Sequence, residues 1–147
     1  MIRTEWVDKA KITYVSMAFP LERIHPNARP ASEAAECAAH QGRFWPMHER
    51  LFAAPRGGLN ITHFAESAIA IGLDLDQFKV CLSGETPSSV AAEIAEARRL
   101  HVNSTPTFFV LHERHLLRLV AERLRVIFAI ATASRVSHRQ VIKHRVR

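Results

Sequence analysis

Residues 102–110 read Val-Asn-Ser-Thr-Pro-Thr-Phe-Phe-Val, and this stretch decides the fold that the sequence predicts. Aromatic and β-branched residues favour a strand over Thr107–Val110. Pro106 stands at the head of this run, where a residue without a backbone N–H is tolerated. A cis bond between Thr105 and Pro106 would be a locked structural device, and the sequence leaves the isomer open.

A second strand is predicted near the start of the chain. Lys11–Met17 is rich in β-branched and aromatic residues, and Pro20, which cannot donate to a strand ladder, stops it. Between the two strands the pattern predicts five short helices. They are expected over residues 31–40, 44–52, 62–71, 74–84 and 86–100, with Thr62, Asp74 or Asp76, and Thr86 as caps and Gly42 and Gly72 as helix ends.

The C-terminal quarter differs in charge from the rest of the chain. Residues 1–110 hold 11 Lys/Arg and 12 Asp/Glu, whereas residues 111–147 hold nine Lys/Arg and two Asp/Glu. Leu116–Phe128 has the apolar spacing of an amphipathic helix, and a basic tail follows it. A basic end without interleaved aromatic residues predicts no specific nucleic-acid binding.

Composition sets the class of protein. A chain of 147 residues with 48% hydrophobic and 23% charged residues fits one soluble globular domain. The N-terminal residues are charged where a signal peptide is apolar, and no run is long enough to span a bilayer. We expect a cytoplasmic protein by default, or a periplasmic one if the true N-terminus is missing.

Several fragments together resemble the DsbA-like branch of the thioredoxin superfamily, over about residues 6–110. The most specific are Phe19-Pro20-Leu21, Ala34-Ala35-Glu36-Cys37-Ala38, Gln41–His48, Gly72-Leu73-Asp74 and Val102–Val110. The resemblance implies an α/β thioredoxin-like fold with an α-helical insertion at about residues 30–100. Residues 1–110 would form this fragment, and residues 111–147 a divergent basic helix and tail.

The resemblance also implies a function, protein thiol–disulfide oxidoreduction. In that family a thiolate of lowered pKa attacks a substrate disulfide, and a second cysteine resolves the mixed disulfide. Thr105 and Pro106 correspond to the family's cis-proline loop, which offers its backbone to the substrate. The expected partner is a protein or peptide carrying a thiol or disulfide, and no cofactor is implied.

Two departures from the family put that activity in doubt. The chain has no Cys-x-x-Cys, and the family's first strand, which carries that pair, would precede Trp6. The fold is then incomplete, and no catalytic residue is retained. Beyond Val110 the chain lacks the glycine-containing hairpin of the family, which suggests a shifted reading frame. We expect an inactive relative; the alternative is a non-catalytic binding protein that uses its helical insertion or basic tail.

Cys37 and Cys81 are candidate structural thiols. They could form a disulfide if their Cα atoms come within about 7 Å, but a cytoplasmic setting favours two buried free thiols. A metal site of Cys37, His40, His48 and Cys81 is conceivable, yet packing or surface histidines are commoner, so we predict no metal. Aromatic residues could line a peptide groove, although helical spacing favours the core; they are Phe44, Trp45, Phe52 and Phe64.

Overall fold

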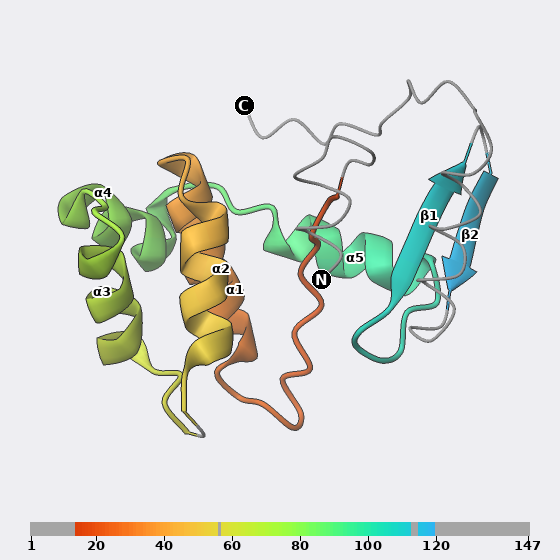
Figure 1. Ribbon diagram of the computed structural model, residues 1–147, viewed down its shortest axis with the longest axis horizontal. Helices are drawn as coiled ribbons and strands as arrows, with labels where there is room; N and C mark the ends of the chain where they lie inside the picture. Colours follow the sequence, from red (N-terminus) through yellow and green to blue (C-terminus); the bar gives the residue numbers. More distant parts are fainter. Residues whose placement is uncertain (1–13, 56, 113–114, 120–147) are drawn as a thin grey trace, which may run out of the picture. The chain divides into compact units, whose positions relative to one another are not determined.

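The computed structural model describes residues 14–55, 57–112 and 115–119 (Figure 1). The chain divides into two compact units. One is helical and consists of Met17–His101; the other combines Met1–Ser16 with Val102–Arg147. No helix in the described ranges has both the length and the apolar character needed to cross a membrane.

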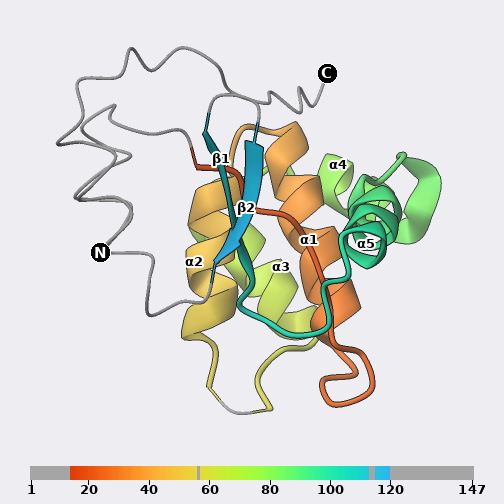
Figure 2. The ribbon, with the colours of Figure 1, turned by 90° about the vertical axis from the view of Figure 1, so that its right-hand side faces the viewer.

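The helical unit contains every helix found among the described residues, and their order matches the succession of short helices predicted over residues 31–100. The elements are α1 (Ala28–His40), α2 (Phe44–Ala53), α3 (Ile61–Ala70), α4 (Leu75–Val80), the π-helical segment η2 (Cys81–Glu85) and α5 (Val90–Arg99). The helices α1, α2 and α3 pack against one another (Figure 2).

The helix ends follow from two glycines, as the sequence predicts. Gly72, with φ of 71°, follows α3. Its N–H donates to the carbonyl of Ile69 at 3.0 Å, while the next N–H, of Leu73, donates to Ala68 at 3.0 Å. Gly42 ends α1 in the same way. This left-handed cap satisfies carbonyls that the helix leaves unpaired, and glycine adopts it at little cost.

The first helix starts at Ala28, three residues before the predicted Ala31, and two of the predicted caps also differ from the structure. The cap of α3 is Asn60, whose side chain accepts from the N–H of His63 at 2.9 Å, and not Thr62. The helix α5 begins at Val90 after Ser89, and not at Thr86. In both regions several cap-forming residues stand within a few positions of each other, so local preference alone does not select one.

The core of the helical unit is built around small side chains of α1. Alanines allow the neighbouring helices to approach closely, so that the larger side chains of α2, α3 and α4 fill the space. The buried cluster consists of Ala31, Ala34, Ala35, Cys37, Ala38, Met47, Leu51, Phe64, Ala68, Leu73 and Phe78. Phe64 is therefore core as expected, whereas Phe52 is 81% exposed and is not.

The second unit contains an antiparallel hairpin of β1 (Phe108–His112) and β2 (His115–Leu119) (Figure 1). Phe108 pairs with Leu119, and His112 pairs with His115. The strand predicted over Thr107–Val110 is confirmed. The helix predicted over Leu116–Phe128 is wrong over Leu116–Leu119, because pairing with β1 overrides a local apolar pattern; residues 120–128 lie outside the described part.

The strand predicted over Lys11–Met17 is not found in its described portion. Tyr14–Met17 has no regular secondary structure, and residues 11–13 lie outside the described ranges. A strand is stable when its backbone pairs with a neighbour. Among the described residues, the sheet consists of β1 and β2 alone, so the β-rich composition of this segment does not lead to a strand there.

Candidate functional site

The loop before β1 is the first candidate, and the structure gives it a defined geometry. The peptide bond between Thr105 and Pro106 is cis, the isomer that the resemblance implied. Both residues are exposed. The Thr107 hydroxyl donates to the carbonyl of Ser104 at 2.7 Å, and the Arg118 guanidinium of β2 donates to Asn103 Oδ1 at 3.4 Å. The hairpin thus holds a loop whose central residues face solvent.

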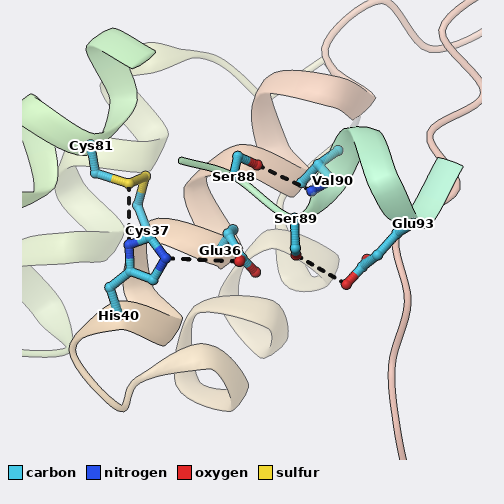
Figure 3. A network of polar contacts seen from close by, with 8 residues as sticks. All are labelled: Glu36, Cys37, His40, Cys81, Ser88, Ser89, Val90 and Glu93. Carbon is cyan, nitrogen blue, oxygen red and sulfur yellow. Dashed lines mark hydrogen bonds and ion pairs between the residues drawn. A yellow bond between two sulfur atoms is a disulfide. The ribbon is translucent and has the colours of Figure 1, made fainter. Parts of the chain in front are cut away.

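The second candidate contains both cysteines of the chain. Cys37 of α1 and Cys81 of η2 form a disulfide with Cα atoms 5.7 Å apart (Figure 3). The expectation of two free thiols is therefore wrong, and the alternative of a bridge within the helical insertion is correct. Cys37 is only 3% exposed, whereas Cys81 is partly exposed. Cys81 is the more exposed residue of the two.

A histidine and a carboxylate lie in line with Cys81. His40 Nδ1 is 3.8 Å from Cys81 Sγ, and His40 Nε2 is 3.8 Å from Glu36 Oε1 (Figure 3). Glu36 and His40 are one helical turn apart on α1, which explains their contact. The side chain of Glu36 is 10% exposed. A carboxylate buried to this extent needs a charged or hydrogen-bonding partner, and His40 is placed to provide one.

Cys81 also borders a surface hollow of about 360 Å³. It lies along η2 and the residues that follow it, and Gly84, with φ of 87°, turns the chain there. The hydroxyl-bearing residues Ser83, Thr86 and Ser88 line the hollow together with Glu33 of α1. A small molecule placed there would lie next to Cys81.

The four residues considered as metal ligands are only partly brought together. Cys37, His40 and Cys81 meet, but the ring of His48 contacts Phe44, Trp45 and Phe52 along α2, with centroid separations of 5.7, 5.4 and 4.6 Å. Within the described ranges, no group of three His, Cys, Asp or Glu could hold a metal ion. The role of Glu36 was missed, although its spacing to His40 was a readable signal.

A family model described as thioredoxin matches residues 1–127 of this chain. The chain belongs to the DsbA-like thioredoxin family. The match extends beyond Val110 and includes β2, so the family's sequence pattern continues past the point where we expected a divergent end. The cis Thr105–Pro106 bond lies within the matched part of this DsbA-like domain.

Relatives of this DsbA-like domain include Na⁺/H⁺ antiporters. Antiporter NhaA 3 of Salinispora tropica is 39% identical over 115 residues, which cover 78% of this chain and 18% of the antiporter. NhaA 1 of Mycobacterium sp. (strain KMS) is 38% identical over 117 residues, or 78% of this chain and 19% of that protein. The chain thus spans less than a fifth of these relatives. No solved structure matches it significantly.

Proposed function

We propose that this DsbA-like chain binds peptide segments of proteins that undergo thiol–disulfide exchange, and that it does not catalyse exchange by the family's Cys-x-x-Cys route. One observation carries the proposal. The chain's two cysteines form a single disulfide between α1 and η2. Neither is a free thiol, so in this state the chain offers no nucleophile to a substrate disulfide.

The position of the cysteines within the helices supports the same proposal. A reactive cysteine of the family type requires a helix N-terminus, whose partial positive charge lowers the thiol pKa. Cys37 lies near the C-terminal end of α1, and Cys81 continues the helical backbone of α4. Neither sulfur is therefore activated by a helix N-terminus.

The binding half of the proposal rests on Thr105 and Pro106. Their exposed loop leads directly into β1, whose one strand partner among the described residues is β2. An extended peptide can add main-chain hydrogen bonds to a loop and strand edge of this kind. Membership of the DsbA-like family makes a protein with a thiol or disulfide the natural class of ligand.

A direct test measures the binding of a reduced and alkylated insulin B chain by fluorescence anisotropy. The substitution Thr105→Glu places a charge and a longer side chain in the loop, and we expect affinity to fall about tenfold, or about 1.4 kcal/mol. Thr62→Glu is the matched control, because Thr62 is also exposed but lies in the first turn of α3. Equal loss of affinity in both variants, or no binding by the parent chain, would refute the proposal.

A further inference from the structure

We propose that Cys81 is a site of reversible thiol–disulfide exchange with a small thiol, with His40 as its proton acceptor and Cys37 as the resolving thiol. The proposal goes beyond peptide binding, since the site lies in the helical unit. It rests on the contact of Cys81 with His40, the contact of His40 with Glu36, and the hollow that Cys81 borders.

The difference in exposure between the two cysteines decides which sulfur is attacked. Cys37 is buried in the core cluster, whereas Cys81 is partly exposed and borders the hollow of about 360 Å³. Exchange requires an incoming thiolate to reach a sulfur of the bridge. A small thiol that enters the hollow therefore attacks Cys81. The lining of the hollow is mixed, with polar residues such as Ser83 and Glu33 and apolar residues such as Leu82.

The exchange can be written so that atoms and electrons balance. A thiolate of the small thiol forms a bond with Cys81 Sγ, the bond between Cys81 and Cys37 breaks, and its electron pair leaves on Cys37, which takes a proton from water. A second small-thiol thiolate then attacks the outer sulfur of the mixed disulfide. This step releases Cys81 as a thiolate and the two small thiols as their disulfide.

His40 acts on the reduced form of Cys81. Its Nδ1, 3.8 Å from Cys81 Sγ, is placed to take the thiol proton, which leaves a thiolate beside an imidazolium. Glu36, 3.8 Å from Nε2, stabilises the positive ring and fixes its orientation. The thiolate attacks one sulfur of the small thiol's disulfide, so that a mixed disulfide forms on Cys81 and one small thiol leaves as its thiolate. Cys37, after losing its proton to water, then attacks Cys81 Sγ; the bridge is restored and the second small thiol leaves as its thiolate. This return step makes the modification reversible.

The test uses the full chain with Cys37→Ser, which prevents resolution, and oxidised glutathione as the probe. We expect a stable glutathione adduct on Cys81, found by peptide mass spectrometry. Adding His40→Gln should slow its formation at pH 7 about tenfold, since a neighbouring positive charge shifts a thiol toward thiolate by about one pKa unit or more. His63→Gln on α3 is the matched control and should leave the rate unchanged.

A structural role for His40 is separated from a chemical one by the ultraviolet absorbance of the thiolate. That absorbance should be stronger with Cys37→Ser alone than with His40→Gln added, while both variants keep the same circular dichroism. Equal absorbance and equal rates would overturn the proposal. If Cys37→Ser fails to fold, the reduced two-cysteine chain is labelled briefly with iodoacetamide: preferential labelling of Cys81 is expected, and equal labelling of Cys37 would overturn it.

Discussion

Cys37 and Cys81 are separated by 44 positions in the sequence, yet their Cα atoms lie 5.7 Å apart and a disulfide joins them. The bridge joins the first residue of η2 to the buried face of α1. The bridge therefore adds one covalent link between two elements that the buried cluster already packs together.

Removing this bridge should destabilise the chain. Cross-linking residues so far apart restricts the conformations of the unfolded chain. The loop entropy predicts that the double variant Cys37→Ala/Cys81→Ala loses about 4 kcal/mol of unfolding free energy. Urea unfolding followed by circular dichroism measures it. The parent chain treated with a reductant serves as the control, and should unfold at nearly the same urea concentration as the double variant. An unchanged midpoint in both would contradict the prediction.

The cap at Asn60 gives a second, more local prediction. Asn60→Ala removes the acceptor for the N–H of His63 and should lower the free energy of unfolding by about 1 kcal/mol. Thr62→Ala, two positions along, removes a hydroxyl that caps nothing in α3 and should change it by less than about 0.5 kcal/mol. Thermal melts of both variants measure the difference, and the reverse order would show that the helix starts at Thr62 after all.

Asp74 predicts a pH dependence. The N–H of Gln77 donates to its carboxylate at 3.0 Å, and with the N–H of Asp76 it lowers the pKa of Asp74 below the ordinary 3.8. Because the folded-state pKa is the lower one, the charged carboxylate stabilises the fold above pH 3.8, and this contribution is lost as the pH falls through the lowered pKa.

The variant Asp74→Asn keeps a capping oxygen but removes the charge. It should melt below the parent chain at pH 7, and the two melting temperatures should converge as the pH is lowered below 3.8. Glu66→Gln, an exposed change on α3, is the control and should give a smaller difference. If the difference in melting temperature between Asp74→Asn and the parent chain stays constant over the whole pH range, the charge of Asp74 contributes nothing to stability.

The core predicts a contrast between two apolar positions. Met47 of α2 is 0% exposed, so Met47→Ala leaves a cavity and should cost about 2–5 kcal/mol. Ile69 of α3 is 61% exposed, so Ile69→Ala should change stability by no more than about 0.5 kcal/mol. Chemical denaturation of the two variants compares them directly. Similar losses at both positions would indicate that α3 presents a different face to the core.

Part of the fold could be predicted because its determinants are local. Gly42 and Gly72 end helices through their own backbone conformation, and the run after Pro106 favours a strand by composition alone. The starts of α3 and α5 could not be predicted as well, because Asn60 competes with Thr62, and Ser89 with Thr86. The strand β2 was missed because Leu116–Leu119 fits a helix until β1 pairs with it.

The candidate site was predictable only in pieces. The spacing of Cys37 and His40 on one helix face was visible, but sequence gives no distance to Cys81, so the choice between a bridge and free thiols stayed open. The packing that brings Cys81 against α1 joins elements that are distant in the sequence. The placement of His40 between Glu36 and Cys81 follows from that packing.

Insulin reduction in the presence of dithiothreitol tests the central claim most directly, namely that this DsbA-like chain does not turn over protein disulfides. We predict that insulin precipitates at the dithiothreitol background rate with the parent chain, and equally with Cys37→Ala/Cys81→Ala. Acceleration that grows with the concentration of the parent chain, and that the double variant lacks, would contradict the account.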